Sequence, residues 1–125
     1  MKPVSVMIVD DDIAARELLS SLLRALLDVN IEALSDGVDA MRRFREQRYD
    51  IVLMDFEMPG MDGLATIEVI KSIRPDQFIA MVSGNSDVGI VKKAIGLGVG
   101  GYLVKPLTTG KVKGIVDKYL KSIST

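Results

Sequence analysis

The 125-residue sequence contains no cysteine, no histidine and no tryptophan, and only 5% of its residues are aromatic. Without cysteine, the chain has no disulfide framework, no thiol nucleophile and no cysteine zinc site. Without histidine, it has no histidine metal cluster, no Ser-His-Asp triad and no phosphohistidine of its own. Chemistry on this chain therefore falls to carboxylates, lysine and arginine, hydroxyls and backbone groups.

The sequence also lacks a strong net charge and a long apolar run. Sixteen Lys and Arg residues against 17 Asp and Glu residues give a net charge of −1, which argues against direct binding of nucleic acid. No apolar run approaches the ~20 residues that span a bilayer, and Asp10 comes too early for the apolar part of a signal peptide. The composition predicts a cytoplasmic protein with no membrane insertion.

What the sequence does contain is a regular alternation of short apolar runs and helical patterns. The 48% apolar content suffices for the core of a single domain, residues 1–125. Short apolar runs, here three to six residues long, are typical of strands buried on both faces of a parallel sheet. The predicted strands are Val4–Val9, Asn30–Leu34, Ile51–Met54, Phe78–Val82 and Tyr102–Val104. A βα unit repeated five times predicts an α/β, doubly wound sheet with helices on both faces.

Five segments between and after these runs have helical spacing. Asp12, Asp36, Asp62 and either Thr108 or Thr109 stand where N-caps are expected. The fifth helix is predicted from a stripe at Val112, Ile115, Val116 and Tyr119, and the fourth from Val88, Val91 and Ile95. Because most of the glycines lie from Gly84 onward, we expect the fourth helix to be short or soft.

Residues able to bind a metal or a phosphoryl group follow four of the predicted strands. Asp10 and Asp11 follow the first strand, Asp55 the third, Ser83 the fourth and Lys105 the fifth. With a strand order of 2-1-3-4-5, the carboxyl ends of the first and third strands flank the crevice where ligands bind in such sheets. We therefore expect the three aspartates to share one crevice, with Ser83 and Lys105 on its far side.

Three neighbouring carboxylates repel one another, and a hard divalent cation removes the conflict. Mg²⁺ binds one or two carboxylates and fills its remaining positions with water and phosphate oxygens. Together with the charge of Lys105, such a site is suited to a transferring phosphoryl group. Because Asp10 and Asp11 stand together as a metal clamp, Asp55 is predicted to be the nucleophile that forms an acyl phosphate.

Four motifs resemble those of the receiver domain, the phospho-accepting module of two-component response regulators. They are Val9-Asp10-Asp11, Asp55-Phe56-Glu57-Met58-Pro59-Gly60-Met61-Asp62-Gly63, Ser83-Gly84 and Tyr102-Leu103-Val104-Lys105-Pro106. All four occur in order, each at the end of a predicted strand. The resemblance extends from Val4 to about Leu120 and implies the flavodoxin-like fold, with its parallel sheet in the order 2-1-3-4-5.

The resemblance also implies a role for each residue. Asp55 resembles the phosphorylated aspartate and a metal ligand, Asp11 the direct Mg²⁺ ligand, and Asp10 a ligand that acts through water. The backbone carbonyl of Glu57 is implied as a further ligand. Ser83 resembles the hydroxyl that turns toward the phosphoryl oxygen. Tyr102 is implied as an aromatic switch and Lys105 as the lysine of the family pattern, with a cis bond to Pro106.

Two positions depart from the commoner pattern. Ser83 replaces the more frequent threonine and is followed by Gly84, which should bring its backbone amide more easily to the phosphoryl group. Glu57 places an acid two residues after the nucleophile, where its side chain would crowd the attacking water or pair with a cation.

The preferred function is a phosphorylation switch rather than an enzyme acting on other substrates. The donor would be a histidine kinase or a histidine phosphotransfer protein. Phosphorylation would change the surface of the fourth helix, fifth strand and fifth helix, which binds a downstream protein. The domain would be a monomer or a phosphorylation-linked dimer.

Two alternatives belong to other classes. One is a docking module of the same fold that does not use phosphate, which has no need of the full acidic set. The other is an enzyme, either a flavodoxin-like electron carrier or an aspartate-nucleophile phosphatase. Three acids after the first strand would repel a flavin phosphate, and Asp55-Phe56-Glu57-Met58 lacks the phosphatase pattern Asp-x-Asp followed by Thr.

Overall fold

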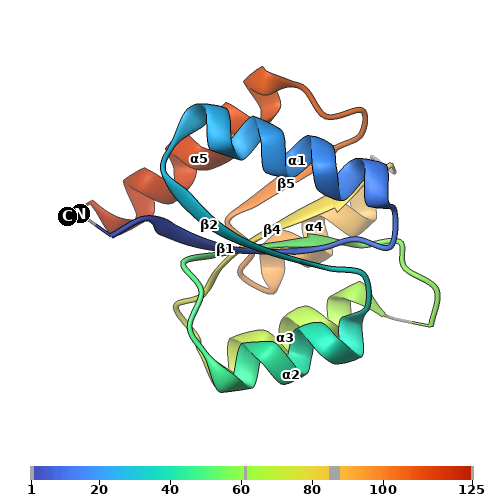
Figure 1. The fold of residues 1–125 in the computed structure, drawn as a ribbon. Helices are drawn as coiled ribbons and strands as arrows, with labels where there is room; N and C mark the ends of the chain where they lie inside the picture. The colour runs from blue at the N-terminus through green and yellow to red at the C-terminus, as the bar shows by residue number, and fades with distance from the viewer. Residues whose placement is uncertain (1, 61, 85–87, 125) are drawn as a thin grey trace.

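The computed structural model of the chain describes residues 2–60, 62–84 and 88–124, in which five strands alternate with five helices (Figure 1). The strands are β1 (Val4–Val9), β2 (Val29–Leu34), β3 (Ile51–Asp55), β4 (Phe78–Ser83) and β5 (Gly101–Val104). The helices are α1 (Ile13–Leu26), α2 (Gly37–Glu46), α3 (Gly63–Ile73), α4 (Val88–Gly96) and α5 (Thr109–Ile123). All five predicted strands are confirmed, and their bounds differ from the prediction by at most one residue.

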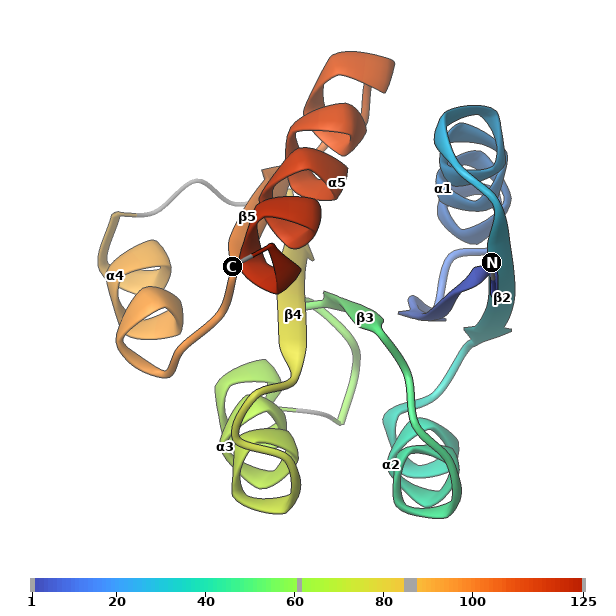
Figure 2. The ribbon, with the colours of Figure 1, turned by 90° about the vertical axis from the view of Figure 1, so that its left-hand side faces the viewer.

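The strands form one parallel sheet in the order β2-β1-β3-β4-β5, as the resemblance implied. Helices α1 and α5 cover one face, and α2, α3 and α4 cover the other (Figure 2). The chain leaves β1 toward β2 and later returns past β1 to form β3. The strand order therefore reverses between β1 and β3, which opens a crevice at their carboxyl ends.

The middle of the sheet forms the core. All five residues of β3 are buried, as are the last four of β1 and the last five of β4. The edge strand β2 has no fully buried residue, which explains why its run is the weakest in the sequence. A core with apolar side chains on both faces of β1, β3 and β4 holds their carboxyl ends in a fixed relation to one another.

Side-chain caps fix where four helices begin. Asp12, Asp36, Asp62 and Thr108 accept hydrogen bonds from backbone N–H groups in the first turns of α1, α2, α3 and α5. These groups have no partner within their own helix, and each such cap is worth about 1 kcal/mol. The predicted caps are confirmed, with Thr108 rather than Thr109 at the start of α5.

The last two helices differ in how well they are packed. In α5, the predicted stripe of Val112, Ile115, Val116 and Tyr119 is buried. In α4, Val88 and Ile95 are 66% and 61% exposed, and Ala94 is the buried residue. The predicted fourth helix is therefore confirmed, but it packs against the core through the small side chain of Ala94 rather than through Val88 and Ile95. At nine residues, α4 is also the shortest helix in the described part of the chain.

Two backbone features lie in β5 and directly after it. A Cβ atom on Gly101 would lie 2.3 Å from Cδ1 of Ile115, so glycine at this position of β5 allows α5 to pack closely against the strand. The Lys105–Pro106 bond is cis, as the resemblance implied.

Among the described helices, none combines the length and hydropathy that crossing a bilayer requires.

Candidate functional site

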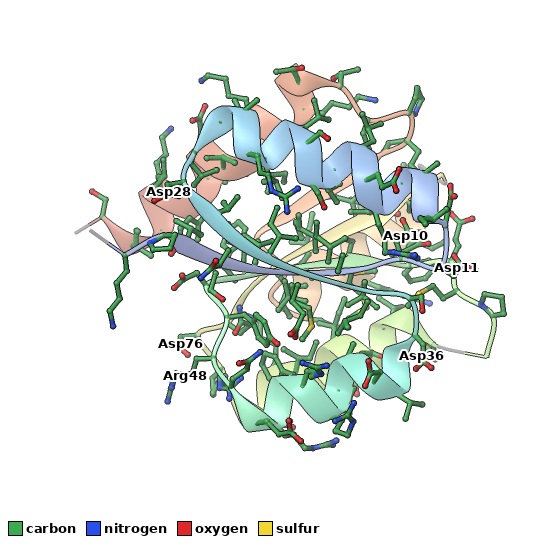
Figure 3. All side chains as sticks on the ribbon, viewed as in Figure 1. Asp10, Asp11, Asp28, Asp36, Arg48 and Asp76 are labelled. Carbon is green, nitrogen blue, oxygen red and sulfur yellow. The ribbon has the colours of Figure 1, made fainter. Side chains whose placement is uncertain are left out.

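The residues that follow the strands meet at one edge of the sheet. Asp10 comes directly after β1, Asp55 ends β3, Ser83 ends β4 and Lys105 follows β5. Figure 3 shows Asp10 and Asp11 at the end of the molecule opposite Arg48 and Asp76. Because parallel strands all end on the same side, the topology gathers side chains that are up to 95 residues apart in sequence.

An acidic cluster occupies this edge. Asp10, Asp11 and Asp55 each present one carboxylate oxygen, and these three oxygens all lie within 4.8 Å of one another. Asp10 and Asp55 are each only 3% exposed, whereas Asp11 is exposed. The predicted convergence of the three aspartates is therefore found, with two of them inside the crevice and the third at its mouth.

Lys105 faces the cluster from β5. Its Nζ lies 3.2 Å from Oδ2 of Asp10 and 3.8 Å from Oδ2 of Asp55. Burial on its own would lower the pKa of Lys105, but the hydrogen bond to Asp10 and the charges of Asp55 and Asp10 outweigh it and raise the pKa. The lysine is therefore a fixed positive charge at the site.

Backbone groups hold the two buried carboxylates in place. Oδ1 of Asp10 accepts a hydrogen bond of 2.9 Å from the amide of Asp12, and Oδ1 of Asp55 accepts one of 3.0 Å from the amide of Glu57. The guanidinium of Arg16 donates to the carbonyl of Asp10 at 2.7 Å. These bonds fix the direction of both acids before any ligand binds.

The environment of Asp55 disfavours its charge. Burial raises the pKa of Asp55 from its ordinary value of 3.8 to about 6. The neighbouring charge of Asp10 acts in the same direction, while the Glu57 amide and Lys105 oppose the shift. A cation placed among the three carboxylates would reverse this balance by favouring the ionised form.

The donor set of the cluster fits a magnesium ion. Mg²⁺ binds oxygen ligands at about 2.0–2.1 Å, so that oxygens sharing one ion lie about 3–4 Å apart. Three carboxylate oxygens within 4.8 Å of one another meet that requirement after small side-chain movements. Carboxylates are also the donors that hard cations prefer over softer metals.

The structure also shows a contact that the sequence did not predict. Oε1 of Glu57 accepts hydrogen bonds from the hydroxyl of Ser83 at 2.5 Å and from the amide of Gly84 at 3.0 Å. Glu57 thus pairs with neutral donors at the end of the neighbouring strand β4, and no ion pair with a lysine or arginine is found for it within the described residues. The sequence singled out Glu57 as an acid two residues after Asp55, but it did not predict that Ser83 and Gly84 would be its hydrogen-bond donors.

Tyr102 lies on β5, half-buried, and packs against the core on the face covered by α2, α3 and α4. Its position next to the strand that carries Ser83 is set by the pairing of β4 with β5, in which Met81 faces Tyr102 and Ser83 faces Val104. The residues implied as switch elements therefore come from adjacent strands.

The doubly wound sheet, with acids and a lysine at its carboxyl edge, is the arrangement that the four motifs implied. The family model described as the response regulator receiver domain matches residues 6–117. The chain therefore belongs to the receiver-domain family of two-component response regulators, and its acidic pocket fits Mg²⁺ and phosphorylation on an aspartate.

Individual relatives agree with this family. The chain is 32% identical to chemotaxis protein CheY-3 of Vibrio cholerae, in a match that covers 98% of this chain and 95% of that protein. It is 33% identical to transcriptional regulatory protein ZraR of Escherichia coli over 94% of this chain and 26% of that protein. The chain thus spans about a quarter of the length of the first curated relatives that it matches.

Solved structures agree as well. The structure of the CheX–CheY–BeF3–Mg²⁺ complex from Borrelia burgdorferi contains a chain that is similar to this one with a TM-score of 0.88 and 28% identity. That similarity covers 94% of this chain and 90% of the other. The fold is therefore that of CheY-like receiver domains.

Proposed function

We propose that this domain is switched by phosphorylation of Asp55, with the phosphohistidine of a histidine kinase or of a histidine phosphotransfer protein as the donor. A carboxylate oxygen of Asp55 attacks the phosphorus, and an acyl phosphate forms. The bond between phosphorus and the histidine nitrogen breaks, and its electron pair returns to the imidazole, which then takes up a proton. The observation that carries the proposal is the convergence of three carboxylates and Lys105 on one crevice.

Asp55 is a better acceptor than its two neighbours. Both oxygens of Asp10 are engaged, one with the Asp12 amide and one with Lys105 at 3.2 Å. Asp11 is exposed and would leave an acyl phosphate open to water. Oδ2 of Asp55 lies 3.8 Å from Lys105, beyond hydrogen-bond distance, while Oδ1 is held by the Glu57 amide. Asp55 is therefore oriented and buried, and one of its oxygens lies within 4.8 Å of carboxylate oxygens of Asp10 and Asp11.

The residues that would hold Mg²⁺ are Asp11 and Asp55 directly, the backbone carbonyl of Glu57, and Asp10 through water. When bound, the ion would neutralise charge on the phosphoryl oxygens. The acidic cluster of this chain supports this assignment. Further support comes from the similar CheY chain of Borrelia burgdorferi, whose complex with CheX holds both Mg²⁺ and BeF3.

The remaining residues would respond to the new charge. Lys105 pairs with a phosphoryl oxygen, Ser83 donates its hydroxyl to another, and Tyr102 changes rotamer on β5. The surface formed by α4, β5 and α5 would then bind a downstream protein. On that surface, α4 carries the exposed side chains of Val88 and Ile95, and a hollow of about 270 Å³ lies between β5 and α5, beside Tyr102. Exposed apolar groups and hollows are both features of protein-binding surfaces.

The same proposal covers the extent of the domain, its location, its oligomeric state and its own chemistry. Residues 1–125 form a single receiver domain that works in the cytoplasm, as a monomer or a phosphorylation-linked dimer. The domain is not an enzyme for other substrates, and it catalyses only its own phosphorylation and dephosphorylation.

Acetyl phosphate tests the acceptor directly. After incubation with Mg²⁺, we expect the intact mass of the wild-type chain to increase by one phosphoryl group. Asp55→Asn, which keeps the shape of the side chain but removes the nucleophile, should show no increase. Asp76→Asn is the matched control, because Asp76 is an exposed acid at the opposite end of the molecule, and it should be phosphorylated like the wild type (Figure 3).

Phosphorylation of Asp55→Asn to the wild-type extent would contradict the assignment of the acceptor. A wild-type chain that takes up neither phosphate nor beryllofluoride would contradict the switch and favour a module that signals by docking alone. Beryllofluoride is included because it binds without hydrolysis, so that a short-lived acyl phosphate is not mistaken for none.

A further inference from the structure

The contact between Glu57 and the end of β4 joins one carboxylate oxygen to two donors. The hydroxyl of Ser83 and the amide of Gly84 both donate to Oε1 of Glu57, at 2.5 and 3.0 Å. Two donors that converge on one oxygen form a small anion site, because a negative oxygen there accepts both bonds at once. In this structure, the oxygen comes from the chain itself.

Burial differs sharply across this contact. Ser83 is 0% exposed, whereas Glu57 is an exposed residue on the loop after β3. If the contact breaks, the carboxylate can be hydrated, whereas the serine hydroxyl stays inside the protein, where a hydrogen bond to a charged acceptor is stronger than one to a neutral acceptor. The geometry therefore describes a carboxylate that can leave for water and a serine hydroxyl that stays buried, next to the amide of Gly84, which is an exposed residue.

We propose that the side chain of Glu57 is an internal competitor for the phosphoryl group. It occupies the Ser83 hydroxyl and the Gly84 amide in the resting domain and leaves them when an oxygen of the phosphoryl group takes its place. The proposal rests on the proposed phosphorylation of Asp55, two residues earlier in the chain. Glu57 acts as a positioning residue, since it holds donors and touches no reacting atom.

Glu57 could affect anion binding in two ways, by occupying the donors of Ser83 and Gly84 or by repelling the anion with its charge, and experiment can separate the two. Removing Glu57 also removes a negative charge near an acidic pocket, which alone would favour binding of an anion. Competition for donors depends on Ser83, whereas through-space repulsion does not. The effect of Glu57→Ala should therefore depend on whether Ser83 is present, and a double-mutant cycle measures that dependence.

The resting contact is tested first, without metal or phosphate. In Glu57→Ala, the NMR signal of the Gly84 amide should move upfield and its hydrogen exchange should accelerate about tenfold, because the amide loses a charged acceptor. Glu57→Gln, which keeps a neutral acceptor, should give a smaller change in the same direction. Glu68→Ala is the matched control, since Glu68 is an exposed acid on α3, and it should leave Gly84 unchanged. An unchanged Gly84 amide in Glu57→Ala would overturn the proposal.

The competition is tested with beryllofluoride and Mg²⁺. We expect Glu57→Ala to bind beryllofluoride about tenfold more tightly than the wild type, a factor at the low end of what one hydrogen bond to a charged group provides. In the Ser83→Ala background, the gain from Glu57→Ala should fall to less than half of that factor. Glu68→Ala should bind like the wild type.

Two results would overturn the role of Glu57 alone. One is equal affinity of the wild type and Glu57→Ala, and the other is the same gain with and without Ser83, which would assign the effect to charge. Failure of every variant and of the wild type to bind beryllofluoride would instead contradict the phosphorylation switch on which the proposal rests.

Discussion

Asp55 is the residue whose surroundings conflict most with its charge. Its pKa of about 6 lies above the ordinary value of 3.8, so the folded chain holds this proton more tightly than the unfolded chain does. The folded state therefore gains stability from Asp55 below pH 4, and that gain is lost as the pH rises through 6. Above pH 7, the site holds a buried charge that opposes folding in the absence of a cation.

Replacing this acid should stabilise the metal-free domain at neutral pH. In urea unfolding with a chelator present, the free energy of unfolding of Asp55→Asn should exceed that of the wild type by about 2 kcal/mol at pH 7.5. This difference should vanish near pH 4. Asp76→Asn should show no such pH-dependent gain. A difference that stays constant from pH 4 to pH 8 would show that the ionisation of Asp55 is not its cause.

Among individual residues, those that end strands were predictable and the contacts between loops were not. Asp10, Asp55 and Lys105 each stand directly after an apolar run, and parallel strands end at one edge, so the sequence predicted that they meet. The contact of Glu57 with Ser83 joins the loop after β3 to the end of β4, 26 residues further along the chain. Its direction depends on side-chain rotamers and on the space around them, which apolar patterns do not specify.

Among the elements, α4 should be the least stable helix of the domain. It has nine residues, it includes Gly89 and Gly96, and its one buried residue is Ala94. Helix α5 has 15 residues, four of which are buried. A glycine inside a helix costs about 1 kcal/mol relative to alanine, and a small buried surface offsets little of that cost.

Hydrogen exchange measures this difference. The backbone amides of α4 should exchange at least tenfold faster than those in the middle of α1 and α5, because local opening of α4 exposes little apolar surface. Equal protection of α4 and α1 would contradict the prediction. A weakly held α4 beside β5 would suit a surface whose shape responds to phosphorylation.

The bounds of the elements followed closely from local signals, and their packing did not. The caps at Asp36, Asp62 and Thr108 were correct because each is a short-range contact between a side chain and the next backbone amides. The pattern of Val88, Val91 and Ile95 correctly predicted a fourth helix, yet Val88 and Ile95 are exposed, since periodicity shows which residues share a face but not whether another element covers it.

For the whole molecule, the function depends on the topology. Asp10 and Lys105 are 95 residues apart in sequence and 3.2 Å apart in space, because β1 and β5 run in the same direction within one sheet. The alternation of runs predicted a parallel sheet, but the order of its strands came from the resemblance of four motifs to a known family. Local patterns carry no information on which strands lie next to each other.

The switch requires that the aspartates at this edge share one divalent cation, and thermal unfolding with Mg²⁺ shows whether they do. At pH 7.5, 10 mM Mg²⁺ should raise the Tm of the wild type by about 4 °C, which corresponds to about 1 kcal/mol in a domain of this size. Asp11→Ala should fold and show no such rise, while Asp76→Ala, a control at the far end, should respond like the wild type. An equal rise in Asp11→Ala and the wild type would contradict the shared site.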